Sequence, residues 1–341
     1  MSHDILSDVL RNVRLRGALY YFVRGNGSWV AEAPAASEIA AAVMAGSEHV
    51  MEYHVLTRGT CWGAVVGETP VRISTGDVVL FPQGDAHVMS SAPGMRAPID
   101  PASYVERKQE QLPFTLYLDA AETRVEIPSD EPCDATLVCG FLGCDLRPFN
   151  PLIETLPRLM HLRAEEGQDW VAQYMRQVVA ESKHKRLGGE AMLERMSEMM
   201  FIVAVRRYIE ALPETSRGWL AGLRDRFVGR VLALMHDAPA DAWTVDELGR
   251  RVGLSRSSLH ERFAELIGQT PIQYLANWRI QVGAALLRNT SSTVATVAQE
   301  VGYESEATFT KAFKRLTGNS PALWRRRIGT GASVGNNLKK Q

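Results

Sequence analysis

Two stretches of the chain match each other and decide the fold of its carboxy-terminal third. VDELGRRVGLSRSSLHERFAELIGQTP runs from Val245 to Pro271, and VATVAQEVGYESEATFTKAFKRLTGNSP runs from Val294 to Pro321, with one extra residue after the glycine. In each copy an amphipathic pattern ends at a Val-Gly pair, and a short turn leads to a serine, Ser255 or Ser305, that can cap a second helix. This layout predicts two helix-turn-helix modules, each with a second helix that enters the DNA major groove.

The segment between the copies and the local charge support this prediction. PIQYLANWRIQVGAALLR predicts one rigid helix from Pro271 to Arg288, which would hold the two modules at a set separation. The formal net charge of the chain is −1, but Leu223 to Thr330 holds 15 Lys and Arg against 10 Asp and Glu, a local charge of +5. The basic part of the chain is therefore the part that would meet DNA.

From about Leu223 to Arg327 the chain resembles the arabinose-operon regulator (AraC/XylS) family of bacterial transcription factors. The resemblance rests on a GxSxSxLxRxFxxxxGxxPxxY-like first half and a GYxSxxxFxxxFKxxxGxxPxxW-like second half. It departs from the family where His260 and Glu261 precede Arg262. The resemblance implies a transcription regulator that binds double-stranded DNA, with RNA polymerase as a candidate partner.

Solvent-facing side chains in the first turns of the two predicted recognition helices are the candidates for base contacts. They are Arg256, Ser257, His260 and Glu261 in the first module, and Glu306, Ala307, Thr310 and Lys311 in the second. Arg256 and Lys311 would contact a base edge or a phosphate, and Glu261 would accept from a cytosine amino group or pair with a nearby basic side chain. Phosphate contacts, or else plain solvated surface, are expected of Arg262, Lys314, Arg315, Arg325 and Arg326.

The amino-terminal part has a different pattern. From Glu48 to Cys144, short apolar or alternating runs are broken by Gly and Pro, which indicates an antiparallel β barrel or sandwich. The proline-rich stretch from Ala92 to Pro113 has no periodicity, so it predicts a long loop, either a lid over that domain or a disordered segment.

One stretch of this part carries a recognisable motif. GDVVLFPQGDAH, from Gly76 to His87, fits the second motif of the cupin family, with Ser91 where the family has Asn. Upstream, EYHVLTRGTCW resembles the first cupin motif in degraded form. A turn at Thr57-Arg58 would put His54 across a hairpin from Cys61, with both side chains on one face.

In cupins that face is the barrel interior, where two or three His and one Glu hold a metal. The resemblance gives His54 and His87 two of these places, Cys61 the Glu place, and Leu56 the place of a further His. Cys139 could supply a fourth ligand, and a His2Cys2 set would suit zinc. Two other interpretations stay open: a redox role for the thiols, or ordinary buried thiols beside two hydrogen-bonded histidines left from an ancestral site.

After Pro148 the apolar period becomes helical. The segment GEAMLERMSEMMFIVAVRRYIEAL is apolar on more than one face, so it either fills its own domain's core or also packs on a second subunit of a homodimer. We therefore expect an α+β multidomain chain. Its expected parts are a cupin-like β-barrel sensor domain at 1–150, a helical linker and dimerisation region at 151–217, an all-α double helix-turn-helix domain at 218–330, and a disordered tail at 331–341.

The whole chain resembles regulators that carry a cupin-type sensor ahead of the DNA-binding domain, which implies control by a small ligand, a metal or a redox signal. The alternatives are a constitutive DNA-binding regulator with a vestigial barrel, and a cupin metalloenzyme. We expect no enzyme, because a cysteine-rich ligand set without an open position suits catalysis poorly and the DNA-binding segment would then have no purpose. With neither a secretory signal nor an apolar run of membrane-spanning length, we expect a cytoplasmic protein without membrane contact.

Overall fold

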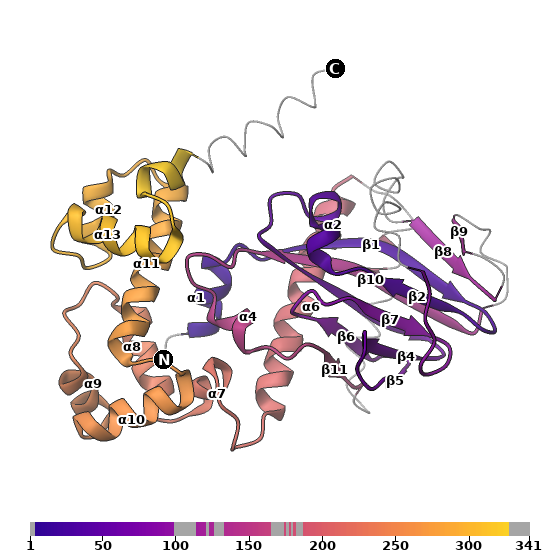
Figure 1. The fold of residues 1–341 in the computed structure, drawn as a ribbon, viewed down its shortest axis with the longest axis horizontal. Coiled ribbons are helices and arrows are strands. Elements are labelled where there is room, and N and C mark those ends of the chain that lie inside the picture. The colour runs from indigo at the N-terminus through magenta and orange to yellow at the C-terminus, as the bar shows by residue number, and fades with distance from the viewer. Residues whose placement is uncertain are drawn as a thin grey trace. The chain divides into compact units, whose positions relative to one another are not determined.

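The computed structural model describes residues 4–98, 114–120, 123–125, 133–164, 174, 177–178, 180–181 and 187–326 (Figure 1). Most of the loop predicted at Ala92 to Pro113, the tail predicted at 331–341 and Arg327 lie outside these residues. The chain forms two compact units. One consists of Met1–Arg14, Asp145–Thr155 and Leu212–Gln341, and the other of Leu15–Cys144 and Leu156–Ala211. The domain limits expected from the sequence remain predictions.

The second of these units, which we call the β unit, contains two sheets. The larger has the strand order β11-β6-β3-β10-β1-β8-β9, and every neighbouring pair is antiparallel except β1 with β8. Its strands are β1 (Arg16–Gly25), β3 (His49–Arg58), β6 (Val78–Phe81), β8 (Phe114–Leu118), β9 (Thr123–Val125), β10 (Ala135–Cys144) and β11 (Met160–Leu162). The smaller has the order β2-β7-β4-β5, formed by β2 (Val30–Ala33), β4 (Thr60–Val65), β5 (Val71–Ser74) and β7 (His87–Ser90).

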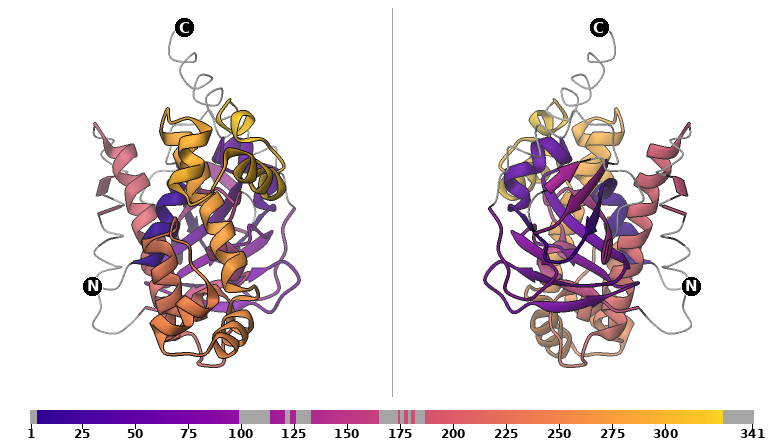
Figure 2. Two further views of the ribbon diagram at one scale, coloured as in Figure 1. Left: turned by 90° about the vertical axis from the view of Figure 1, so that its left-hand side faces the viewer. Right: turned by 90° about the vertical axis from the view of Figure 1, so that its right-hand side faces the viewer.

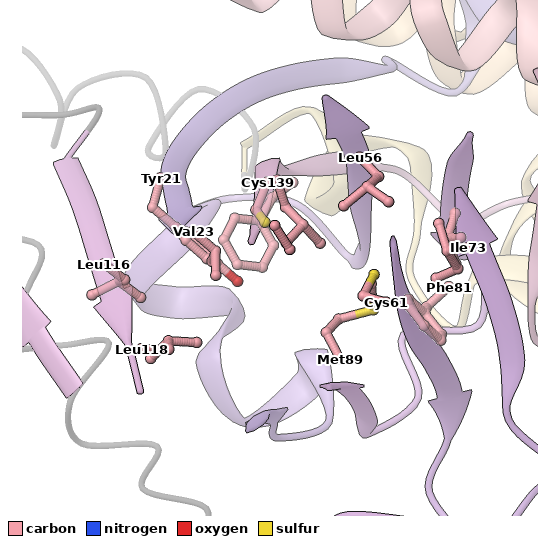
Figure 3. Close-up of a cluster of buried hydrophobic side chains, with 14 of the residues drawn as sticks. Tyr21, Val23, Leu56, Cys61, Ile73, Phe81, Met89, Leu116, Leu118 and Cys139 are labelled. Atoms are coloured by element: carbon pink, nitrogen blue, oxygen red, sulfur yellow. The ribbon is translucent and has the colours of Figure 1, made fainter. Parts of the chain in front are cut away.

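One core lies between the two sheets. Leu56, Phe81 and Cys139 reach it from the larger sheet, and Cys61 and Met89 from the smaller one (Figure 3). The apolar face of helix α2 (Ala36–Val43) adds to the same core. The β-rich fold of the amino-terminal region is as predicted, but the described strands form two open sheets rather than a closed barrel.

The predicted hairpin around Thr57-Arg58 is wrong. β3 continues to Arg58, and the chain turns at Gly59, which has a φ of 83° that glycine adopts without strain. In the described part of the chain β3 pairs with β10 and β6, whereas β4 pairs with β5 and β7. The turn therefore carries the chain from one sheet to the other, and His54 and Cys61 are not cross-strand partners.

A long helix, α6 (Gly189–Ala211), packs against β1 in the same unit (Figure 2). The approach is close because β1 has a glycine at the contact. A Cβ atom on Gly17 would lie 2.5 Å from the Cβ of Ser197 and 2.6 Å from the carbonyl oxygen of Glu194. The absence of a side chain at Gly17 therefore leaves the space into which α6 packs.

The other unit, which we call the helical unit, contains the repeat. Its helices are α1 (Ile5–Asn12), α4 (Pro151–Thr155), α7 (Trp219–Arg224), α8 (Val228–Asp237), α9 (Val245–Val252), α10 (Arg256–Ile267), α11 (Pro271–Asn289), α12 (Val294–Glu300) and α13 (Glu306–Thr317). The pairs α9–α10 and α12–α13 lie near opposite ends of α11 (Figure 1). No helix among the described residues is both long enough and apolar enough to cross a membrane.

Candidate functional site

Helix α10 is the recognition helix of the first module. Ser255 begins it as predicted, because its hydroxyl accepts the N–H of Ser258 at 3.2 Å, and Gly268 ends it with a φ of 79°. Leu259 and Phe263 point into the core of the module. The opposite face is exposed, and it carries all five side chains predicted to contact DNA from this helix: Arg256, Ser257, His260, Glu261 and Arg262.

Two of these side chains have intramolecular partners. Arg256 lies 3.3 Å from Asp246, but both side chains are largely exposed, so the pair is weak and DNA can replace it. Arg262 donates from Nε to both oxygens of Asp225, whose Oδ1 also accepts the N–H groups of Phe227 and Val228 at the start of α8. Burial raises the pKa of Asp225. The hydrogen bonds from Arg262 and from the two backbone N–H groups together lower it by more, so the net shift is downward. Arg262 therefore also ties α10 to α8.

Helix α13 repeats this design in the second module. The Ser305 hydroxyl accepts the N–H of Thr308 at 3.2 Å, and Phe309 and Phe313 fill the core together with Trp324. The predicted contact residues lie on the outer side of the helix. Thr310 is half-buried, and Glu306, Ala307, Lys311, Lys314 and Arg315 are exposed.

The two arginines after α13 differ. Arg325 donates from Nε to the carbonyl oxygen of Leu287 at 3.1 Å and from Nη2 to that of Ser292, so its guanidinium closes the end of α11. Arg326 is exposed. Arg325 therefore has a structural use that the predicted phosphate contact did not anticipate.

Helix α11 sets the distance between the modules. Thr270 and Gln273 form a capping box at its start, with Pro271 in the first turn. Its 19 residues correspond to a rod of about 28 Å at 1.5 Å per residue, close to the ~34 Å that separates successive major grooves on one side of DNA. The arrangement suits two recognition helices in adjacent grooves.

The β unit contains a second cluster of functional groups, at the edge of its core. Glu52, His54 and His87 each offer one ligand atom, and these atoms lie within 4.8 Å of one another. The Nε2 atoms of the two histidines are 2.8 Å apart, and the carboxylate oxygens of Glu52 lie 3.6 Å from His87 and 3.9 Å from His54. Tyr21 donates its hydroxyl proton to Glu52 at 2.6 Å. All three side chains are buried.

Burial governs the charge state of this cluster. It raises the pKa of Glu52 to about 8, although the hydrogen bond from Tyr21 opposes the shift. Burial also lowers the pKa of His87 to about 4, and burial with the nearby His87 lowers the pKa of His54 well below its usual range. Near neutral pH both imidazoles are neutral and Glu52 is protonated, so the short contacts of this cluster are not ion pairs.

The two predicted thiol ligands lie elsewhere around this cluster. Cys139 is 3.0 Å from Nδ1 of His54, the ring nitrogen opposite the one that faces His87. An ion held between His54 and His87 would therefore not meet Cys139. Cys61 points toward Met89 in the apolar core and is not part of the cluster that the described residues form (Figure 3). Burial raises the pKa of both thiols, to about 12 for Cys61, which disfavours thiolate chemistry.

Sequence reasoning missed Glu52, which occupies the carboxylate place of the cluster. The signal was present, because alternate residues of a strand face the same side and Glu52, His54 and Leu56 follow at intervals of two. Two neutral imidazoles and one carboxylate form a donor set that suits zinc, iron(II) or related divalent metals, with coordination positions left for water or a small ligand. The residues present fit such an ion, provided that the two imidazoles part slightly and Glu52 loses its proton.

Comparisons with known proteins agree with the two-part layout. A family model described as Cupin matches residues 4–210, and one described as Helix-turn-helix domain matches residues 248–327. An AraC-like transcription regulator of Streptomyces lividans is 29% identical over 325 residues, which cover 95% of this chain and 98% of that protein. The chain belongs to the AraC-type transcription regulators with an amino-terminal cupin domain.

The chain is also similar to other proteins that are named as transcription factors or regulators. The HTH-type transcriptional regulator AlkR of Acinetobacter baylyi is 25% identical over 325 residues, which cover 94% of this chain and 99% of AlkR. Among solved structures, the DNA-binding domain of AdpA in complex with a target DNA matches 30% of this chain and 92% of its own, at 29% identity and a TM-score of 0.29. The family models and the regulators that match nearly the whole chain confirm the predicted family and its DNA-binding function.

Proposed function

We propose that this AraC-type regulator is controlled by a divalent metal, with zinc as the first candidate, held by Glu52, His54 and His87 in its cupin domain. The observation that carries the proposal is the convergence of three buried ligand atoms within 4.8 Å. Buried polar groups normally satisfy one another through fixed donors and acceptors, and a protonated carboxylic acid facing two neutral imidazoles is costly to keep without a purpose. A bound cation would stabilise the carboxylate and use both imidazole lone pairs.

The proposed DNA contacts follow the exposed faces of the recognition helices. Arg256 and Lys311 are the strongest candidates for base contacts, because both are exposed near the start of their helices. Lys314 and Arg315 would contact phosphates from the outer side of α13. A DNA-binding regulator acts where the DNA is, so we place it in the cytoplasm, and contact with RNA polymerase stays a prediction.

We further propose that α6 pairs with α6 of a second copy in antiparallel fashion. Met192 and Met199 are 41% and 46% exposed, a large apolar area for one side of a helix whose other side is already buried. Acidic residues outnumber basic ones in the first half of the helix, where Arg195 is the one basic residue, and basic residues outnumber acidic ones in the second, where Glu210 is the one acidic residue. An antiparallel pair would place the acidic half, Glu190, Glu194 and Glu198, opposite the basic half, Arg206 and Arg207.

Metal analysis of the purified full-length chain tests the central proposal. Wild type should bind about one zinc per chain in calorimetry, and His87→Ala and Glu52→Gln should abolish this binding. His161→Asn is the matched control, since His161 bonds to Asp77 outside the cluster. Zinc should also change protection of promoter DNA by wild type and not by His87→Ala. Zinc binding without any change in DNA protection would leave a constitutive regulator with a structural metal.

We propose no catalytic reaction for this chain. Two proteins that are similar over nearly the whole chain are named as transcription regulators, and the helical unit already provides a function. An open coordination position would suit a small molecule that modulates the regulator as well as a substrate. Turnover of a small molecule by the zinc-loaded chain would contradict this part of the proposal.

A further inference from the structure

A buried carboxylate in the helical unit joins residues that are far apart in the sequence. Asp145 is bound by Arg14, whose Nε lies 2.7 Å from Oδ2, and by Arg288, whose Nη2 lies 3.1 Å from the same oxygen. The side chains of Asp145 and Arg288 are only 5% and 7% exposed. Burial of such charges is favourable only when the partners are in place, because an unpaired charge in this position is strongly destabilising.

The positions of these residues in the chain show which segments the cluster connects. Arg14 stands two residues before β1, and Asp145 directly follows β10. β1 and β10 are antiparallel neighbours, with Arg16 opposite Gly143, so the chain first enters and first leaves the β unit at adjacent strand ends. Arg288 lies in the last turn of α11. One ion-pair cluster therefore connects the first two of the four crossing points to the helix that spaces the recognition helices.

A second side chain of α11 reaches the same two segments. Gln281 is fully buried, and its Oε1 accepts the N–H of Phe149 at 3.0 Å while its Nε2 donates to the carbonyl oxygen of Asn12 at 3.0 Å. One amide group thus closes hydrogen bonds with the segment before β1 and the segment after β10. Its donor and acceptor are both satisfied only when the two segments are docked together.

A third contact completes a stripe along α11. The Tyr274 hydroxyl accepts the indole N–H of Trp219 at 2.9 Å and lies 2.8 Å from Nε2 of His236, whose Nδ1 is 3.6 Å from Asp8 on α1. Tyr274, Gln281 and Arg288 follow at intervals of seven, so they lie along one side of the helix. That side of α11 is fixed by buried polar contacts over its whole length.

We propose that Gln281 and Arg288, with Arg14 and Asp145, form a clamp that positions α11 for DNA binding by tying it to the segments where the chain first enters and first leaves the β unit. These are positioning residues, since none of them needs to touch DNA. The clamp sets the separation and relative rotation of the two recognition helices, and it makes both depend on the two chain segments of the helical unit that hold Arg14 and Asp145. This inference rests on the proposed two-helix mode of DNA binding.

The test uses the full-length chain and DNA that wild type selects from a random pool. Wild type should prefer the selected spacing between the two half-sites over the same DNA with one inserted base pair. Arg288→Met and Gln281→Leu should reduce this preference by about threefold or more, the size of coupling expected between contacting groups. Arg325→Met is the matched control: Arg325 also anchors the end of α11 but contacts neither crossing segment, so the preference should persist.

Hydrogen exchange separates positioning from simple loss of folding. Arg288→Met should accelerate exchange in residues 4–14 and 145–155 while the amides of α10 and α13 remain protected, and Arg325→Met should leave the two segments unchanged. If Arg288→Met unfolds the unit, the double variant Asp145→Leu with Arg288→Met removes the buried charges as a pair and should fold with the same loosened spacing preference. Unchanged exchange and unchanged spacing preference in Arg288→Met would overturn the clamp. Failure of wild type to select any sequence would count against the DNA-binding mode, while exchange would still decide the clamp.

Discussion

The Nε2 atoms of His54 and His87 face each other across 2.8 Å. Nδ1 of His87 is 3.0 Å from the carbonyl oxygen of Asp85, which can only accept, so this nitrogen carries the proton of the neutral ring. Nε2 of His87 is then an acceptor, and His54 must donate to it from its own Nε2. The thiol of Cys139 consequently donates to Nδ1 of His54.

This proton arrangement predicts a tautomer change on metal binding. A cation bound at Nε2 of His54 needs its lone pair, so the proton must move to Nδ1 and point toward Cys139. Nitrogen chemical shifts of the histidines in the full-length chain, recorded with and without zinc, should show the change at His54 and an unchanged tautomer at His87. Cys139→Ala should bind zinc more weakly without losing the site, by about tenfold, as expected for a residue that orients a ligand.

Glu52→Gln should alter how stability of the metal-free chain depends on pH. The folded-state pKa of Glu52, about 8, lies above the unfolded value, so Glu52 stabilises the fold at low pH and loses that contribution as pH rises from about 4.5 through 8. Glutamine keeps the shape without this loss. In chelator, the free energy of unfolding of the variant should exceed that of wild type increasingly from pH 5 to pH 8.

The histidines act in the opposite direction. His87 has a folded-state pKa of about 4, below its unfolded value of 6.5, so its contribution is present above pH 6.5 and is lost as pH falls toward 4. Both wild type and Glu52→Gln should therefore lose stability below about pH 6. A constant difference between the two proteins across the whole range would contradict the protonated state of Glu52.

Recognition of DNA should depend on Arg256 and Lys311. Alanine at either position should weaken specific operator binding by about 1 to 3 kcal/mol if the side chain contacts bases. Lys314→Ala should instead weaken binding to all sequences and reduce the slope of log affinity against log salt by about 1. Titrations at several salt concentrations separate the two roles, and unchanged operator affinity in both Arg256→Ala and Lys311→Ala would rule out these positions.

Arg262 and Asp225 should behave as a structural pair. Arg262→Ala removes the tie between α10 and α8 and should lower the free energy of unfolding by about 1 to 3 kcal/mol. Lys314→Ala should leave stability nearly unchanged, because Lys314 has no ion-pair partner among the residues that the structure describes. Because the pKa of Asp225 is lowered in the fold, its contribution should be present above about pH 4 and lost below it. If Arg262→Ala and Lys314→Ala were equally stable, Arg262 would have no structural role and would serve DNA contact alone.

The α6 surface predicts a dimer that one charge can break. Met199→Lys places an ammonium group at the centre of the proposed helix pair and should give a monomer in sedimentation velocity, with no change in the melting of the chain itself. Leu187→Lys adds the same charge to a fully exposed side chain just before the helix and should leave the dimer intact. A monomeric wild type would end this part of the proposal.

Local patterns predicted the helical unit well because each signal is contained in a few residues. Ser255 and Ser305 cap the helices they were expected to cap, and the residues predicted to meet DNA lie on exposed faces, mostly well exposed. The β unit was harder, since strand pairing depends on distant partners. The hairpin placing Cys61 opposite His54 required β3 and β4 to pair, whereas β3 pairs with β10, more than 70 residues further along. Because Cys61 was given the carboxylate place on the strength of that hairpin, Glu52 was not considered as a ligand. No local pattern signals that Arg14, Asp145 and Arg288 meet.

The close approach of β1 and β10 at their ends has a consequence for how the protein can be divided. The helical unit is assembled from three separate pieces of chain and the β unit from two, so pieces of the two units alternate along the sequence. A chimera that exchanges the β unit should therefore replace both Leu15–Cys144 and Leu156–Ala211. The junctions after Arg14 and before Asp145 are closely spaced, because they adjoin two neighbouring strands. A fragment begun at Leu212 would keep both recognition helices but expose a polar stripe that the missing pieces were shaped to cover.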